Sequence, residues 1–174
     1  TVFEPVALAV TETHVDPTCA GLSDGTATAA ATDGTASYTY SWDAAAGNQT
    51  TATASGLAAG TYTCTVTDLH GCTETVDATL IDPPAMVPGL TASADQCLTG
   101  NSFTFTNTGT TGVTYSWDFG DAAPGTSTAE DPTYSFPAAG TFTVTQTVGA
   151  GACAMSTTVD VTVHPMPVPT ALAD

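Results

Sequence analysis

The feature that most constrains the fold of this chain is the occurrence of apolar residues at every second position. Tyr38, Tyr40 and Trp42 alternate with polar residues, and Tyr115 and Trp117 do so in the second half. Thr or Ser fills most of the intervening positions. Successive side chains of a strand point to opposite faces of the sheet, so this pattern predicts antiparallel strands with one buried and one wet face. We therefore predict an all-β chain.

Two parts of the sequence follow the same plan. Tyr-Ser-Trp-Asp occurs at 40–43 and again at 115–118, and Ala-Ala-Gly-Thr occurs at 58–61 and again at 138–141. Turn residues separate the short strands at regular intervals, which is typical of a sandwich. The repeated plan predicts two tandem immunoglobulin-like antiparallel β-sandwiches.

The prolines set the expected boundaries. Pro83 and Pro84 interrupt strand pairing between the two halves. We expect one sandwich at 1–83, including an N-terminal strand, and a second at 84–165. A proline-rich tail at 166–174 then forms a stiff linker. Because residue 1 is Thr, we expect a processed chain or an excised repeat.

The charge of the chain excludes several functions. The 174 residues include 17 Asp and Glu but no Lys or Arg, which gives a net charge of −17. Nucleic-acid binding needs cations that displace counterions from phosphates, so we expect none. The absence of Lys and Arg also excludes a catalytic Lys that forms a Schiff base and an Arg that binds phosphate or carboxylate. We also expect no membrane insertion, because no apolar run reaches about 18 residues.

The lack of cations also favours an extracellular location. A chain without Lys and Arg resists trypsin-like proteases, and abundant salt or divalent ions outside a cell would screen its carboxylates. The simpler interpretation is a soluble, self-repelling chain.

The five cysteines suggest disulfides. Each half has an early and a late cysteine, so we expect one bond between Cys19 and Cys72 and another between Cys97 and Cys153. Such bonds indicate an oxidising compartment, whereas reduced cysteines would indicate the cytosol. Cys64 alternates with apolar neighbours, so we expect a buried, inert thiol there.

Residues 19–72 resemble the SprB-type repeat of giant surface adhesins of gliding Bacteroidota. The resemblance rests on Cys-Ala-Gly-Leu-Ser-Asp-Gly-Thr at 19–26, Tyr-Thr-Tyr-Ser-Trp at 38–42, and Gly-Leu-Ala-Ala-Gly-Thr-Tyr-Thr-Cys-Thr-Val-Thr-Asp at 56–68. It ends at Gly71 and Cys72. Asp33-Gly34 stands where the family usually has Gly-Gly, and Cys64 where it usually has an aliphatic residue.

Residues 97–163 resemble a polycystic-kidney-disease (PKD) domain. Tyr-Ser-Trp-Asp-Phe-Gly-Asp at 115–121 carries the resemblance, with Asp-Pro-Thr-Tyr-Ser-Phe at 131–136 and Pro-Ala-Ala-Gly-Thr-Phe-Thr-Val at 137–144. Ala122 replaces the Gly that usually follows the motif.

The resemblances imply a non-enzymatic, extracellular structural or adhesive repeat of a surface adhesin or filament, similar to cargo of the type IX secretion system. The alternative is an accessory spacer or a carbohydrate- or protein-binding module of a larger secreted protein. Neither family brings a catalytic residue. His14, His70 and His164 lie far apart, and no Gly-x-Ser-x-Gly motif occurs, so we expect no enzyme.

Five aspartates are candidate calcium ligands. Asp118 and Asp121 flank a Phe-Gly turn, and Asp24, Asp33 and Asp68 lie in Gly-containing loops. Calcium takes carboxylate oxygens from such loops. The alternative is that each Asp caps its own turn by accepting backbone hydrogen bonds.

The N-terminal segment is a candidate for assembly. Val2 and Phe3 are expected to reach a neighbouring subunit, in the manner of a donated strand. Alternatively, Val6, Leu8 and Val10 form the first strand of their own sandwich. The expected partners are further copies or neighbouring repeats, and surface glycans or proteins.

Overall fold

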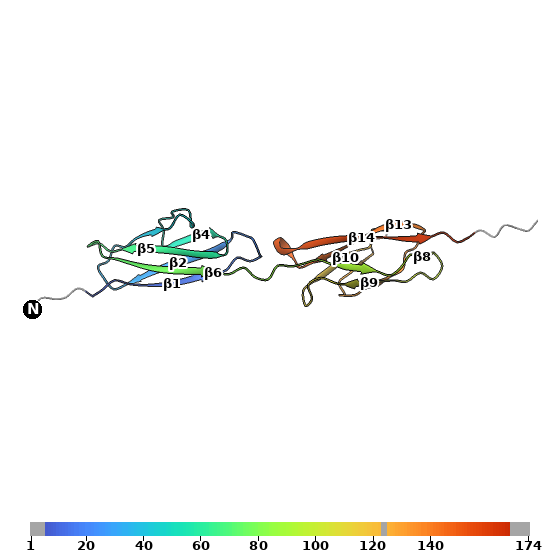
Figure 1. Ribbon diagram of the computed structural model, residues 1–174, viewed down its shortest axis with the longest axis horizontal. Helices are drawn as coiled ribbons and strands as arrows, with labels where there is room; N and C mark the ends of the chain where they lie inside the picture. The colour runs from blue at the N-terminus through green and yellow to red at the C-terminus, as the bar shows by residue number, and fades with distance from the viewer. Residues whose placement is uncertain (1–5, 123–124, 168–174) are drawn as a thin grey trace, which may run out of the picture. The chain divides into compact units, whose positions relative to one another are not determined.

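The computed structural model describes residues 6–122 and 125–167, and these form two compact units, Thr1–Ala85 and Met86–Asp174 (Figure 1). The division lies two residues beyond the boundary expected from the prolines. The regular structure of the described residues consists of strands and a short 3-10 helix, η1 (Gly151–Cys153). The prediction of an all-β chain is confirmed.

Unit 1 contains two antiparallel three-stranded sheets. The first has the order β1-β2-β4 and the second the order β3-β5-β6. The strands of the first are β1 (Ala9–Val15), β2 (Gly25–Thr32) and β4 (Thr53–Leu57). Those of the second are β3 (Thr39–Trp42), β5 (Gly60–Thr67) and β6 (Thr73–Leu80). Buried and exposed residues alternate along β2 and β5, as the alternation in the sequence predicts.

The core of unit 1 is built around Trp42, which is 1% exposed. Its indole Nε1 donates a hydrogen bond to the carbonyl oxygen of Thr51 at 2.9 Å, so the polar edge of the ring is satisfied. Ala27, Ala29 and Ala54 belong to the same buried cluster. The small alanine side chains of the first sheet and the large Trp42 ring of the second sheet thus form one core.

Unit 2 contains a five-stranded sheet of order β11-β10-β13-β14-β8 and a three-stranded sheet of order β12-β9-β7. The larger sheet comprises β8 (Gln96–Cys97), β10 (Tyr115–Asp118), β11 (Thr126–Ser127), β13 (Gly140–Val148) and β14 (Met155–His164). The smaller comprises β7 (Leu90–Ala92), β9 (Phe103–Asn107) and β12 (Thr133–Tyr134). The pairing is antiparallel except between β8 and β14, which are parallel.

The core of unit 2 is mainly aromatic. Phe105 lies 5.9 Å from Trp117 and 5.4 Å from Phe119, measured between ring centroids. Phe136 meets Phe103 edge to face at 5.3 Å. Such contacts add to the free energy of apolar burial. Both tryptophans are therefore core residues, which leaves neither ring free to stack on a sugar.

Two buried amide side chains in unit 2, those of Gln146 and Asn101, have hydrogen-bond partners at both their nitrogen and their oxygen. Gln146, which is 0% exposed, donates to Asn107 Oδ1 at 2.8 Å and accepts from the Gly89 backbone nitrogen at 3.2 Å. Asn101 exchanges hydrogen bonds with the backbone of Phe136. Among the described residues, every buried side-chain nitrogen and oxygen has a partner, as a stable core requires.

Candidate functional site

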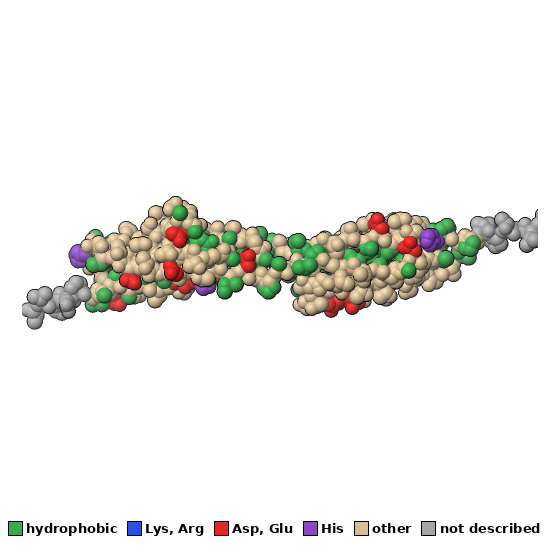
Figure 2. Space-filling model, viewed as in Figure 1, with side chains coloured by type: hydrophobic (Ala, Val, Ile, Leu, Met, Phe, Trp, Pro, Cys, Tyr) green, Lys and Arg blue, Asp and Glu red, His purple; other side chains and the backbone are tan. Residues whose placement is uncertain are grey.

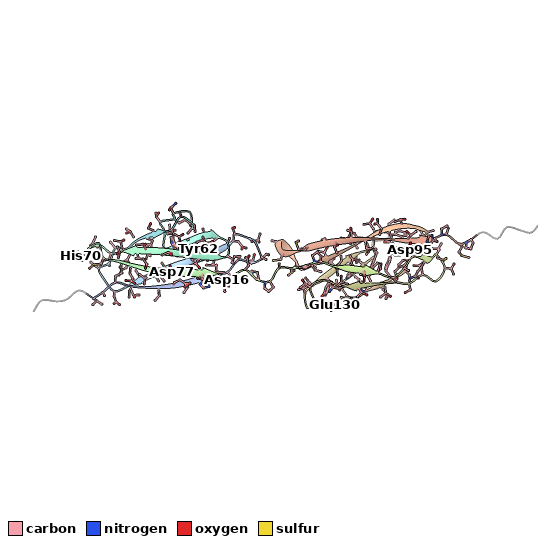
Figure 3. All side chains as sticks on the ribbon, in the orientation of Figure 1. Asp16, Tyr62, His70, Asp77, Asp95 and Glu130 are labelled. Atoms are coloured by element: carbon pink, nitrogen blue, oxygen red, sulfur yellow. The ribbon has the colours of Figure 1, made fainter. Side chains whose placement is uncertain are left out.

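The two ends of unit 1 carry different groups. At one end, Asp16 accepts a hydrogen bond from Ile81 at 2.8 Å, and Asp82 accepts one from Gly21 at 3.1 Å. The loop between β1 and β2 therefore lies where β6 ends. His70 lies at the opposite end, beside the start of β6. Figure 3 labels Asp16 and His70 at these two ends.

This arrangement corrects the first expected disulfide. Cys19 lies in the β1–β2 loop, at the end of unit 1 where β6 finishes, while Cys72 directly precedes β6. Eight residues of strand span roughly 25 Å, whereas bonded cysteines have Cα atoms less than about 7 Å apart. Cys72 is a free, exposed thiol. Cys19 is not a free thiol, but Cys72 is not its partner.

The second expected disulfide is wrong for the same reason. Cys97 pairs with His164 at the end of β14, whereas Cys153 lies in η1, just before β14 begins. The ten residues of β14 span roughly 30 Å. Cys97 is a free, exposed thiol, and Cys153 is not free. Disulfide chemistry is present in this chain, but not in the pairs that chain order suggested.

Cys64 behaves as expected. It is 0% exposed within the unit 1 core and has a free thiol. Burial raises the pKa of this thiol, because an apolar environment disfavours the thiolate. A protonated, buried thiol is a poor nucleophile, so Cys64 is inert.

Asp68 organises the end of unit 1 where the chain enters. Its carboxylate accepts backbone hydrogen bonds from Thr35 at 3.0 Å, from His70 at 2.9 Å and from Cys72 at 2.9 Å. The hydrogen bond from Thr35 is the largest cause of a lowered pKa at Asp68; those from Cys72 and His70, and the charge of His70, contribute further. The Thr35 hydroxyl also pairs with His70 Nδ1 at 2.8 Å. These contacts fix the loop that holds Cys72.

A pocket of about 360 Å³ opens beside Cys72. Val6 and Leu8 provide an apolar part of its wall, while Asp68, His70 and Glu74 provide a polar part. The volume lies within the range of about 300–1,000 Å³ for ligand sites. Sequence reasoning did not identify this pocket, because its lining comes from three separate segments.

The end of unit 2 where the chain leaves carries Cys97. The parallel pairing of β8 and β14 places Cys97 opposite His164. The chain then continues through Pro165 to Met166, whose sulfur accepts a hydrogen bond from the Thr99 hydroxyl at 2.7 Å. Met166 is 58% exposed. An exposed thiol and an exposed apolar side chain thus share this end.

The five candidate calcium ligands are divided between the two units, with Asp24, Asp33 and Asp68 in unit 1 and Asp118 and Asp121 in unit 2. Asp24 accepts hydrogen bonds from the hydroxyl and from the backbone nitrogen of Thr18, and these lower the pKa of Asp24. Asp33 has a left-handed backbone with φ of 62°, and its carbonyl accepts the Tyr38 hydroxyl at 2.7 Å. Asp68 holds the loop described above. Asp33 therefore lies in a loop that Asp68 holds through the backbone of Thr35, whereas Asp24 lies in the β1–β2 loop.

The other two aspartates belong to the Phe-Gly turn of unit 2. Asp118 Oδ1 accepts the backbone N–H of Gly120 at 2.9 Å. Gly120 has φ of 71°, and a Cβ there would collide with the Thr143 carbonyl oxygen, so the turn requires glycine. The second carboxylate, Asp121, accepts the Tyr134 hydroxyl at 2.5 Å and raises the pKa of Tyr134 to about 12.

The described part of the chain contains no group of three or more His, Cys, Asp or Glu side chains arranged to hold a metal. Nor does it contain a helix long and apolar enough to cross a membrane. His14 pairs with Glu12, far from the pocket beside His70. Val2 and Phe3 lie outside the described residues. Leu8 and Val10 pack against the unit 1 core, and Val10 lies in β1.

Comparison with family models gives two matches. Residues 11–47 match the SprB repeat, and residues 89–163 match the PKD domain. The order agrees with the resemblances found in the sequence. Domains of these two kinds are structural or adhesive, and they are typical of extracellular surface proteins. No curated protein matches the chain.

Several solved structures are similar to this chain at low sequence identity. Murine CEACAM1b is 12% identical, with a TM-score of 0.42, covering 91% of this chain and 100% of that one. Amphioxus IgVJ-C2 is 12% identical, with a TM-score of 0.37, covering 92% and 99%. Domains 4 and 5 of the S-layer protein SbsC are 16% identical, with a TM-score of 0.35, covering 93% and 100%. These likenesses carry no argument about function.

Proposed function

Since the chain contains a SprB repeat followed by a PKD domain, we propose that it is a non-enzymatic structural and adhesive module of a secreted surface adhesin or filament. The observation that carries this proposal is the occurrence of both matches in series, at 11–47 and 89–163. Export by the type IX secretion system and stabilisation by a disulfide belong to the same proposal.

The surface chemistry supports the proposal. Hydroxyl side chains pair across neighbouring strands in both units: Thr28 with Thr53, Thr61 with Thr79, and Thr147 with Ser156. These short polar side chains lie on the solvent-exposed faces of the sheets, which carry no Lys or Arg. Figure 2 shows scattered Asp and Glu on the visible face. Such a surface lacks the sites at which trypsin-like proteases cut.

The partners we propose are further copies or neighbouring repeats, together with a surface glycan or protein as adhesive target. The alternative role, an accessory spacer or binding module of a larger secreted protein, uses the same fold. Trp42 and Trp117 are both buried, so a sugar platform would need other side chains.

Immunogold electron microscopy of intact cells tests the proposal. Antibodies against the purified chain are applied to cells of the source organism before and after permeabilisation, with an antibody against a cytosolic protein as control. We expect gold on filaments outside unpermeabilised cells. Label that appears only after permeabilisation would contradict the proposal, and label on dispersed secreted material would favour the accessory module.

A further inference from the structure

The structure leaves two cysteines able to react. Of the five in the sequence, Cys64 is buried, and Cys19 and Cys153 are not free thiols. Cys72 and Cys97 are both free and exposed. Any covalent link made by a thiol of the native chain must therefore use one of these two.

Each of these thiols lies at a particular end of its unit. Cys72 lies beside Val6 and Leu8, where the chain enters unit 1. Cys97 lies beside His164, where the chain leaves unit 2. Unit 1 comes first in the sequence and unit 2 second. The two thiols therefore lie at the entry of the chain into unit 1 and at its exit from unit 2.

The surroundings of the two thiols are complementary. The pocket beside Cys72 has apolar walls at Val6 and Leu8. Close to Cys97 in the sequence, the Thr99 hydroxyl donates a hydrogen bond to the sulfur of Met166, and Met166 remains 58% exposed. An unbranched thioether fits irregular apolar pockets well. Met166 of one copy is thus the right kind of group to enter the pocket of the next.

We propose that Cys72 of one copy and Cys97 of another form an intermolecular disulfide that joins copies of this chain head to tail. This inference rests on the proposed filament function and names its covalent link. Met166 of the preceding copy occupies the pocket and brings Cys97 toward Cys72.

The reaction needs an oxidant, which we take to be a low-molecular-weight disulfide. One protein thiolate attacks this disulfide, forms a mixed disulfide and releases one small thiol. The thiolate of the second copy then attacks the protein sulfur of the mixed disulfide and releases the other small thiol. Two protein thiols are oxidised, and the small disulfide is reduced to two thiols.

The test is a linking assay on the full chain in a buffer of reduced and oxidised glutathione, followed by non-reducing electrophoresis. We expect a ladder at multiples of the monomer mass. Because the chain has no Lys or Arg, the linked peptide is identified by mass spectrometry after cleavage at aspartate. It should join Cys72 to Cys97.

Single variants separate this link from unspecific oxidation. Cys72→Ser and Cys97→Ser should each stay monomeric alone, and their mixture should give a dimer but no ladder. Cys64→Ser should give the same ladder as the parent. Dimers of either variant alone at the parent's rate, or no dimer in the mixture, would overturn the proposal. Thermal melts check that each variant is folded.

A further variant tests the pocket contact. Met166→Asp should slow linking at least tenfold, while alkylation of Cys97 by iodoacetamide stays at the parent's rate. Equal linking rates for M166D and the parent would overturn the role of Met166. Surface labelling of cells that carry both Cys→Ser changes should persist, so failure of the link and failure of the proposed function are distinguishable.

Discussion

The hydroxyl group of Tyr134 donates a hydrogen bond to Asp121 Oδ2 at 2.5 Å. This contact joins the last residue of the Tyr-Ser-Trp-Asp-Phe-Gly-Asp motif to strand β12. The Tyr134 ring also stacks on Phe119, with centroids 4.1 Å apart and an angle of 7° between planes. The motif is therefore tied to the smaller sheet by one polar and one aromatic contact.

Replacing Tyr134 by Phe keeps the stacking and removes the hydrogen bond. We expect Y134F to lower the free energy of unfolding of unit 2 by about 1 kcal/mol, since the contact is charge-assisted but partly open to solvent. Urea unfolding measures the change. Tyr38→Phe, which removes a hydroxyl in unit 1, is the control and should leave the unit 2 transition in place. An unchanged Y134F would contradict this role.

The same contact predicts a loss of stability at high pH. The folded pKa of Tyr134 is about 12, above the value of about 10 for an unfolded tyrosine. Folding therefore favours the protonated form. The contribution is complete below pH 10 and is lost as the pH rises to 12. Thermal melts of the parent and Y134F should converge over this interval, and parallel curves would contradict the assignment.

Asp68 predicts a loss of stability at low pH. Its lowered pKa means that folding favours the carboxylate, so the contribution is present above about pH 4 and is lost as the pH falls further. Asp68→Ala should lower the melting temperature of unit 1 at pH 7 and flatten its acid dependence. The control is Asp77→Ala, because Asp77 accepts only the Thr63 hydroxyl on an exposed face. Equal effects of both changes would contradict a special role for Asp68.

Cys64 predicts a difference between native and denatured thiol counts. We expect two cysteines, Cys72 and Cys97, to react with iodoacetamide in the native chain and a third, Cys64, to react only in denaturant. Burial keeps the Cys64 thiol protonated and out of reach. Cys64→Val should show two reactive thiols in both conditions. Native labelling of Cys64 at the rate of Cys72 would contradict the buried assignment.

The strands and the core were predictable, because burial of one face of a strand requires apolar residues at every second position, and this alternation is visible in the sequence. Trp42, Cys64 and Trp117 all lie in the cores that this alternation indicated. The disulfide state of Cys72 and Cys97, which are both free thiols, was not predictable in this way. An early and a late cysteine can lie at opposite ends of one strand. The order of the cysteines in the sequence does not show at which end of the sandwich each of them lies.

The polar contacts inside unit 2 also escaped prediction. Gln146 occupies an inward position of β13, where the pattern calls for an apolar residue. Its partners, Asn107 and Gly89, come from segments far away in the sequence. Similarly, the pocket beside Cys72 forms only when residues near 6, 35 and 70 meet. Such long-range pairings depend on topology, which a local pattern does not specify.

The candidate calcium ligands give the last prediction. Oxygens of Asp24, Asp68, Asp118 and Asp121 already accept hydrogen bonds. A calcium ion would have to compete with these donors for the same oxygens. We therefore expect melting curves that do not change between millimolar calcium and a chelator. A rise in melting temperature with calcium would contradict turn capping. If this rise disappears in Asp118→Asn, the ion is assigned to the Phe-Gly turn. If it disappears in Asp24→Asn, the ion is assigned to the β1–β2 loop.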